Sequence, residues 1–158
     1  MSSTGATTIR LASSSDLPAI STLVSLAYSP YIPRLDGKFP APMTADYASL
    51  INSSFLFSLI ANETVVGCIS LCASTGHDSA LEINNLAIHP SSQGKGYGKL
   101  LLAFAEDVAK EKGLKNCCLY TNVKMVENVA LYSKLGYKEI GRWSEDGFER
   151  VFFVKALN

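Results

Sequence analysis

The chain has 158 residues, of which 47% are apolar and 18% are charged, and a chain of this size and composition can bury one full hydrophobic core. Fourteen Lys and Arg residues balance fourteen Asp and Glu residues, so the formal net charge is zero. A neutral chain has no strong field to gather nucleic acid or an anionic membrane surface. We therefore expect a single domain over residues 1–158, with no nucleic-acid or membrane partner.

Targeting signals and metal motifs are missing from the sequence. The longest apolar stretches, such as Phe55–Ala61, fall far short of the roughly 20 residues that cross a bilayer, and residues 1–8 have no cationic segment followed by an apolar one. The cysteines have no His or Cys partners at zinc spacing, which favours reduced, buried thiols; they are Cys68, Cys72, Cys117 and Cys118. These features predict a cytoplasmic protein without a metal site.

The first third of the chain predicts one strand and two helices. Thr8–Leu11 alternates as a strand does, and Ser15 is the expected N-cap of a helix. Residues 28–42 contain four prolines and predict a loop, after which Thr44 is expected to cap a short helix that ends at Asn52. The apolar positions of the first helix recur at helical spacing; they are Ile20, Leu23, Val24 and Ala27.

The middle of the chain predicts three strands and a long helix. Two β-rich runs, Phe55–Ala61 and Thr64–Cys72, flank the hairpin turn Asn62-Glu63. A turn over residues 74–79 and a strand over Leu81–Ile88 follow. The helix Gly98–Lys112 is expected to bury one apolar side; that side comprises Leu100, Leu101, Phe104, Ala105 and Val108.

The last third predicts a buried strand, Cys117–Thr121, and a helix, Val126–Leu135, which Gly136 ends. Two final strands, residues 137–143 and 148–155, flank the turn Asp146-Gly147, the strongest hairpin signal in the chain. The predicted order is β-α-α-β-β-β-α-β-α-β-β, which indicates a mixed α/β domain with a strand-loop-helix unit in its middle.

That unit contains a glycine-rich loop, Gln93-Gly94-Lys95-Gly96-Tyr97-Gly98. Glycines at alternate positions let backbone N–H groups converge at a helix N-terminus, where the dipole favours a phosphate or pyrophosphate. The spacing fits neither the P-loop nor the dinucleotide-binding fingerprint. A tight turn that binds no ligand remains the alternative.

These residues resemble the GNAT superfamily of acetyl-CoA-dependent N-acetyltransferases. The family signature Gln/Arg-x-x-Gly-x-Gly/Ala follows a strand of the type Leu-Ala-Val-x-Pro, and here Leu86-Ala87-Ile88-His89-Pro90 precedes the loop. The stretch Ala130–Tyr137 is similar to the A-x-x-L-Y-x-K-x-G-F/Y helix end of the family, so the resemblance covers residues 7–155. It implies a single-domain GNAT fold, a mixed central β-sheet flanked by helices.

The resemblance also implies acetyl-CoA as co-substrate, and no metal. Backbone groups of the strand would pair with the pantetheine arm, and loop N–H groups would hold the pyrophosphate. Where many members have a pantetheine-binding asparagine this chain has Met125, so we expect Asn122 or Asn128 to substitute. The implied coenzyme-binding residues are Leu86, Ala87, Ile88, Gln93, Gly94, Lys95, Gly96, Tyr97, Gly98, Lys99, Asn122 and Asn128.

Acetyl transfer to an amine needs a base and an acid. An alkylammonium has a pKa of ~10.4, so a group or a water chain must remove a proton. Glu82 lies where some family members place the base, although a strand glutamate that pairs with a lysine is the alternative. A phenol of pKa ~10 can protonate the leaving thiolate, and Tyr132 matches the tyrosine that the family places beside the coenzyme sulfur. A purely structural core tyrosine is the alternative.

In the family, the acceptor enters over the first two helices and the final hairpin, here residues 28–47 and 143–148. The expected acceptor-binding residues are Tyr28, Tyr31, Arg34, Tyr47, Asn84 and Trp143. The amides of Asn84 and Asn85 could position a water or the amine, or satisfy strand-edge backbone groups. We expect direct transfer to a primary amine of a small molecule; a peptide or protein acceptor, and a non-catalytic acyl-CoA-binding module, are the alternatives. A homodimer is left open.

Overall fold

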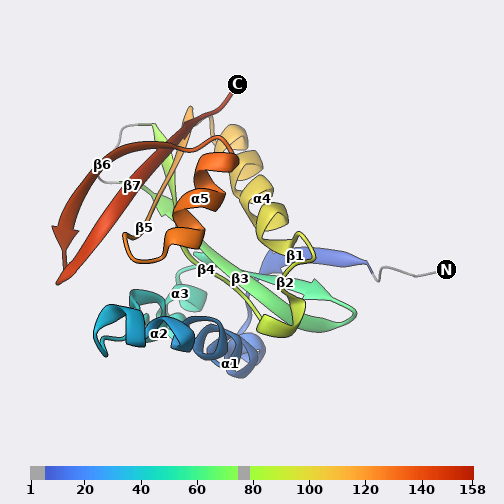
Figure 1. Ribbon diagram of the computed structural model, residues 1–158. Helices are drawn as coiled ribbons and strands as arrows, with labels where there is room; N and C mark the ends of the chain where they lie inside the picture. Colours follow the sequence, from blue (N-terminus) through green and yellow to red (C-terminus); the bar gives the residue numbers. More distant parts are fainter. Residues whose placement is uncertain (1–5, 75–78) are drawn as a thin grey trace. The chain divides into compact units, whose positions relative to one another are not determined.

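A computed structural model describes residues 6–74 and 79–158 as a mixed α/β fold (Figure 1). Its strands form one sheet in the order β1-β2-β3-β4-β5-β7-β6. The β4–β5 pair is parallel, whereas β1–β2, β2–β3, β5–β7 and β6–β7 are antiparallel. The strands and α-helices are β1 Thr7–Leu11, α1 Leu17–Tyr28, α2 Ala41–Thr44, α3 Tyr47–Asn52, β2 Leu56–Ala61, β3 Thr64–Ala73, β4 Ala80–Ile88, α4 Tyr97–Glu111, β5 Asn116–Asn122, α5 Val126–Lys134, β6 Lys138–Glu145 and β7 Phe148–Ala156.

The described residues divide into two compact units, and β3, β4 and α4 each contribute to both. The first unit contains the described residues up to Leu71 together with Asn85–Phe104. The second contains the described residues of Cys72–Asn84 and the chain from Ala105 onward. The mixed α/β fold predicted from the sequence is confirmed; one domain over residues 1–158 stays a prediction.

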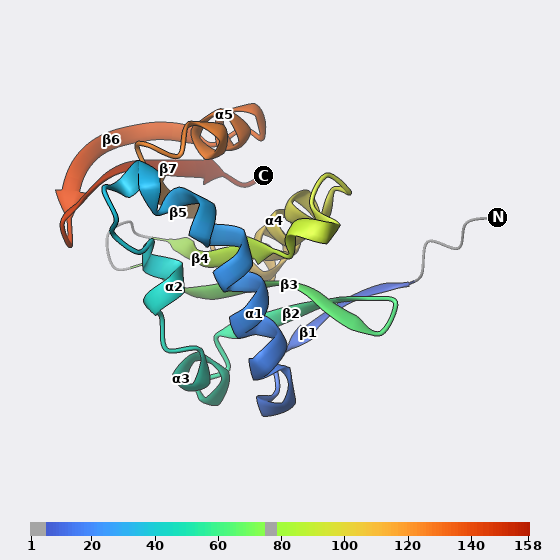
Figure 2. The ribbon, with the colours of Figure 1, turned by 60° about the horizontal axis from the view of Figure 1, so that its bottom comes forward.

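In the first unit, α1 crosses one face of the strands β1 to β3 (Figure 2). Ile20, Leu23 and Val24 of α1 are buried at helical spacing, as predicted, and they pack in one apolar cluster with Leu56 of β2. Gly67 of β3 permits a close approach to the end of β4, because a Cβ at this position would lie 2.7 Å from Ile88 Cδ1. The end of β4 is thereby held tightly against β3.

Two predicted helix caps are wrong. A 3₁₀ turn, Ser14–Asp16, precedes α1, and Ser13 rather than Ser15 begins it. The Asp16 carboxylate accepts the Ser13 backbone N–H at 2.9 Å and an Arg10 N–H at 2.7 Å. Thr44 is the last residue of α2 and does not start a helix. Pro42 lies in the first turn of α2, a position that suits proline. Asp46 caps α3 by accepting the Ser49 N–H at 3.1 Å.

In the second unit, α5 packs on the face of β7 that carries Phe153. The Tyr132 ring lies 5.9 Å from the ring of Phe153 and 6.1 Å from that of Tyr137. Lys155 and Glu106 form a partly buried ion pair at 3.1 Å beside Tyr137. This face of β7 is therefore covered by side chains of the unit itself, whereas β6 is mostly exposed.

Both predicted hairpin turns are confirmed. Asn62 and Glu63 have φ values of 50° and 63°, and Asp146 and Gly147 have φ values of 54° and 81°. Positive φ at both central residues is the geometry that suits the twist of a two-residue hairpin. The expected turn at residues 74–79 falls largely on residues 75–78, which lie outside the described residues.

The prediction of which side of α4 is buried is partly wrong. Leu100 is 39% exposed, whereas Leu102 and Ala109, which were not predicted to be buried, are buried together with the predicted Leu101 and Ala105. Neighbouring apolar residues allow two helix faces that differ by one residue, and only the packing of the helix selects between them. All four cysteines are free thiols, as predicted, but Cys72 is only half-buried, whereas the prediction was that all four are buried. Within the described chain, no helix combines the length and apolarity needed to cross a bilayer.

Candidate functional site

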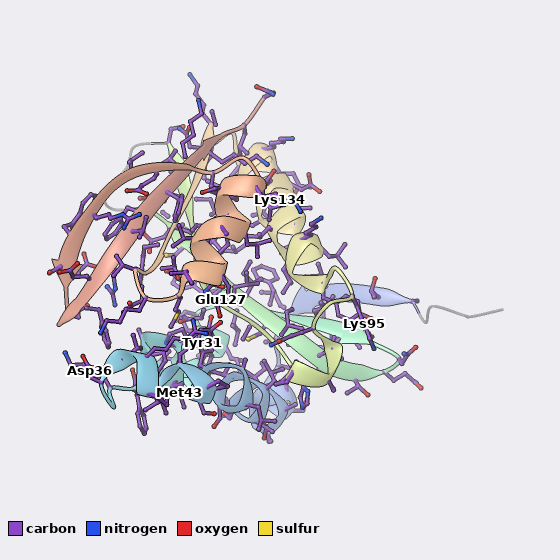
Figure 3. The ribbon with its side chains drawn as sticks, viewed as in Figure 1. Tyr31, Asp36, Met43, Lys95, Glu127 and Lys134 are labelled. Atoms are coloured by element: carbon purple, nitrogen blue, oxygen red, sulfur yellow. The ribbon has the colours of Figure 1, made fainter. Side chains whose placement is uncertain are left out.

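The glycine-rich loop in the first unit joins β4 to the N-terminus of α4. Gly94 and Gly96 have φ values of +81° and +83°, a region that glycine occupies without steric cost. The Gln93 side chain donates to the Ile88 carbonyl at 3.1 Å, and His89 Nδ1 accepts the Ser91 N–H at 3.1 Å. These bonds hold the chain as it leaves β4, and Figure 3 shows Lys95 on the loop that follows.

The loop has the properties that an anionic group requires. The N–H groups at the start of an α-helix have no intrahelical partner and carry the positive end of the dipole, and α4 is 15 residues long. The first helical bond joins Leu100 N–H to Gly96 O at 3.1 Å. A Cβ placed at Gly94, Gly96 or Gly98 would meet nothing within 4 Å. Space for a ligand is therefore open beside the three glycines, and the loop fits a pyrophosphate.

The end of β4 offers backbone groups to a neighbouring ligand, but two of its carbonyls already accept hydrogen bonds. The Tyr28 hydroxyl donates to Leu86 O at 2.5 Å, and Gln93 donates to Ile88 O. Asn85 lies within β4 with a φ of 50°, and its side-chain amide donates to Ser70 Oγ at 3.1 Å. A pantetheine arm beside Leu86–Ile88 would use backbone N–H groups or the second lone pair of these carbonyls.

In the second unit, Glu82 of β4 lies half-buried in a small polar cluster. Asn84 Nδ2 donates to Glu82 Oε2 at 3.0 Å and also contacts Cys72 Sγ at 3.3 Å. Burial raises the pKa of the Cys72 thiol, and the Glu82 carboxylate raises it further. No ion pair of Glu82 occurs among the residues that the structure describes. The alternative of a glutamate paired with a lysine is thus not observed there.

The resemblance to the family also singled out Tyr132, Asn122 and Asn128, and all three lie in the second unit. Tyr132 is only 9% exposed and packs against Tyr137 and Phe153. Asn122 Oδ1 accepts the Lys124 N–H at 2.9 Å and so shapes the β5–α5 turn. Asn128 Nδ2 contacts Thr121 Oγ1 at 3.4 Å. Both amides therefore have internal partners.

The expected acceptor residues fall into two groups. In the first unit, the Tyr31 ring lies 6.2 Å from that of Tyr28 and 5.0 Å from the Arg34 guanidinium. Tyr47, in contrast, is a core residue that is 7% exposed, and its hydroxyl donates to Pro42 O at 2.6 Å. In the second unit, Asn84 contacts Glu82, and Trp143 is an exposed residue of β6.

Sequence reasoning missed several side chains around Trp143. The Trp143 indole stacks on Phe152 at 3.9 Å and 8°, and the Arg150 guanidinium lies 4.4 Å from the Tyr120 ring centre. Arg150 is 5% exposed and pairs with Glu145 at 2.6 Å. The sequence feature that could have identified them is the alternation of side chains along β7, which places Arg150 and Phe152 on one face of the sheet.

The chain matches known acetyltransferases in sequence. A model of the acetyltransferase (GNAT) domain matches residues 52–139, which is more than half of the chain. The Xenopus tropicalis protein "Probable N-acetyltransferase 14" is 29% identical over 105 residues, 66% of this chain and 50% of that protein. Other matched relatives are named for an aminoalkylphosphonate acceptor and for a ribosomal-protein acceptor. The chain spans between 21% and 62% of the length of the curated relatives that it matches.

Solved structures share the fold at low identity. The ribosomal-protein-S18-alanine N-acetyltransferase of Escherichia coli superposes with a TM-score of 0.73 at 19% identity, over 97% of this chain and 95% of that one. The PaiA N-acetyltransferase of Thermoplasma acidophilum, solved in complex with coenzyme A, gives 0.70 at 20% identity, over 96% and 99%. The fold, the loop and the family match agree, and the chain belongs to the GNAT acetyltransferase family.

Proposed function

We propose that the chain is an acetyl-CoA-dependent N-acetyltransferase that moves an acetyl group directly to a primary amine of a small molecule. The observation that carries the proposal is the β4–α4 loop, in which two glycines with φ above +80° and open space beside them precede the N-terminus of a 15-residue helix. Membership of the GNAT family, and a solved neighbour that holds coenzyme A, support the same ligand.

The loop residues Gln93 to Gly98 would hold the pyrophosphate, and Lys95 and Lys99 would add positive charge beside it. The backbone of Leu86, Ala87 and Ile88 would pair with the pantetheine arm as an added strand does. Asn122 or Asn128 would substitute for the family asparagine, since each amide uses one of its two polar groups for an internal contact. Acetyl-CoA supplies the activated acyl group when it is bound.

In the proposed mechanism, Glu82 accepts the proton of the attacking amine, directly or through water, while the carbon–nitrogen bond forms. Asn84 holds one oxygen of that carboxylate, Oε2, so the other oxygen is the one assigned to the proton. Tyr132 donates its hydroxyl proton to the departing thiolate as the carbon–sulfur bond breaks. Solvent then restores both groups.

The acceptor class is assigned from the candidate acceptor residues and the charge of the chain. In each unit the candidate residues combine aromatic surface with a polar group, which is the composition of a small-molecule site: they are Tyr28, Tyr31 and Arg34 in the first unit, and Trp143 and Asn84 in the second. The zero net charge gives no field for a charged macromolecule. A peptide acceptor is the competing assignment.

An amine panel with acetyl-CoA tests the proposal by the release of thiol. We expect release that depends on the amine, and a higher melting temperature with coenzyme A alone. Small primary amines and short peptides with a free N-terminus form separate arms, and peptide turnover that exceeds that of every small amine would reverse the acceptor assignment. Stabilisation by coenzyme A without turnover of any acceptor would indicate a non-catalytic acyl-CoA-binding module. No binding at all would contradict the proposal.

A further inference from the structure

Cys72 of β3 lies beside the proposed base and makes two contacts that the proposed mechanism does not use. Its sulfur accepts an N–H of the Asn84 side chain at 3.3 Å, and its thiol donates to Glu82 Oε2 at 4.0 Å. Asn84 Nδ2 also donates to this carboxylate oxygen, at 3.0 Å. The thiol, the amide and the carboxylate therefore form a closed triangle of contacts, all within the second unit.

The chemistry of the three groups determines how the triangle is oriented. An ionised carboxylate only accepts hydrogen bonds, so the Asn84 amide turns its nitrogen, and not its oxygen, toward Glu82. The amide nitrogen has two hydrogens, and one of them reaches the carboxylate while the other reaches the sulfur. Cys72 thus supplies the acceptor that keeps the second amide hydrogen paired and the amide turned toward the base.

The Cys72 thiol is suited to hold a neighbour and not to attack a thioester. A thiol has an ordinary pKa of ~8.5. Burial is the main cause that raises the pKa of Cys72 above its ordinary value, and the Glu82 carboxylate adds to the rise. The thiolate is the nucleophilic form of cysteine, and a raised pKa makes it scarce at neutral pH. The protonated thiol can still donate to the carboxylate.

The triangle occupies one of the two carboxylate oxygens of Glu82. Both donors reach Oε2, and within the part of the chain that the structure describes no hydrogen bond reaches Oε1. A rotation of the Glu82 carboxylate would exchange the two oxygens, and the two contacts to Oε2 oppose that rotation. Oε1 is therefore the oxygen left to receive a proton from an amine or from a bridging water.

We propose that Cys72 is a positioning residue for the base: it holds the Asn84 amide and the Glu82 carboxylate so that Oε1 receives the proton. This role rests on the proposed function, because it exists only if Glu82 is the base. A misplacement of a reacting group by about 1 Å can cost roughly a hundredfold in rate. The hydrogen bonds of a thiol are weak, so the loss of Cys72 should cost less than that.

Alanine and serine at position 72 differ by one hydroxyl group, so the two variants separate the polar contacts from the loss of bulk. Cys72→Ala should lower kcat about five- to twentyfold and leave the KM for acetyl-CoA unchanged. Cys72→Ser keeps a donor and an acceptor and should retain at least about half of the wild-type kcat. Cys118→Ala is the matched control: it removes a thiol in register with Glu82 that the Ser74 side chain hydrogen-bonds, and it should retain the wild-type kcat.

A double-mutant cycle tests whether Cys72 acts through Glu82. The turnover that remains in Glu82→Gln does not use the carboxylate, so adding Cys72→Ala to it should lower kcat by less than about twofold. A purely structural role would lower kcat by the same factor in both backgrounds. Circular dichroism would confirm that each variant is folded.

Alkylation of Cys72 tests the contact with Glu82 without any turnover and without a variant at position 72. 2-Iodoacetamide reacts with the thiolate form of cysteine, and peptide mass spectrometry measures the modified fraction of Cys72 separately from the other three thiols. Glu82→Gln removes a negative charge that raises the Cys72 pKa. Alkylation of Cys72 at about pH 8 should therefore be about three- to tenfold faster in Glu82→Gln than in the wild type.

The outcomes distinguish this inference from the proposed function. A wild-type kcat in Cys72→Ala, or a Cys72→Ser protein as slow as Cys72→Ala, would overturn the positioning role and leave the acetyltransferase proposal intact. An equal loss in both backgrounds of the cycle, or equal alkylation rates, would do the same. A wild-type rate in Glu82→Gln would overturn both the base and its positioning residue, but not acetyl transfer. No thiol release from any amine would overturn the positioning role together with the proposed function.

Discussion

A negative charge at Gly98 should abolish tight coenzyme A binding without unfolding the protein. Gly98 is the second residue of α4, and a Cβ there meets nothing within 4 Å. Gly96 is a poorer choice for the same test, because its φ of +83° would strain any other residue. Gly98→Asp therefore separates ligand binding from backbone strain.

The expected change in stability is small and favourable. Replacing glycine in a helix gains a few tenths of a kcal/mol in helix propensity, and an acidic residue in the first turn gains about 0.3–1 kcal/mol from the dipole. Together these terms raise the free energy of unfolding by about 0.5–1.3 kcal/mol. The corresponding rise in melting temperature is about 1–5 °C.

The expected loss in the free energy of coenzyme A binding is larger than this gain in stability. Two like charges about 5 Å apart repel by roughly 3 kcal/mol at an effective dielectric constant of 20, and by about 1 kcal/mol in water. The loop is exposed, so the value should lie between these limits. Coenzyme A should therefore bind about ten- to a hundredfold more weakly to Gly98→Asp.

Isothermal titration calorimetry would measure the Kd for coenzyme A. Thermal unfolding of the free variants would measure their stability. Gly98→Asn is the matched control, since it adds nearly the same volume without the charge, and it should bind at least tenfold more tightly than Gly98→Asp. The difference should shrink as salt is raised. A folded Gly98→Asp protein with the wild-type Kd would refute the assignment of the loop to the pyrophosphate.

Three further predictions concern the proposed acid, the proposed base and the first helix. Tyr132→Phe should lower turnover by roughly ten- to a thousandfold with acetyl-CoA binding nearly unchanged, because only a proton donated in the transition state is lost; weak binding with normal turnover would make Tyr132 a coenzyme anchor instead. Glu82→Gln should lower turnover near neutral pH and recover part of it at high pH, where more of the amine is neutral; a wild-type rate with an unchanged pH profile would exclude Glu82 as the base. Asp16→Asn should cost about 1–2 kcal/mol in urea unfolding at pH 7, because the hydrogen bond from Arg10 is the main cause that lowers the Asp16 pKa, to about 2. This stability is present above the unfolded pKa of ~3.9 and is lost as pH falls toward 2, so a cost that does not change between pH 7 and pH 3 would contradict the linkage.

Local backbone conformation could be predicted from the sequence where a few adjacent residues determine it. The turns Asn62-Glu63 and Asp146-Gly147, and the glycine-rich loop before α4, are examples, since Asn, Asp and Gly adopt positive φ more readily than other residues do. The caps were harder to predict. Several Ser, Thr and Asp residues stand near each helix start, and the choice of Ser13 and Asp46 depends on where the helix packs.

The sequence by itself determined the order of the strands and of the longer helices, the loop that fits an anion, and the family to which these motifs belong, but it missed the short helix α2, which begins inside the predicted loop. Only the tertiary structure decided which side chains meet: Asn84 with Glu82, Trp143 with Phe152, and Arg150 with Tyr120. The reason is the range of the forces involved. Turn and cap preferences act over three or four neighbouring residues, whereas contacts between strands depend on register, and the register shift at Gly141 is set by the whole β6–β7 pairing.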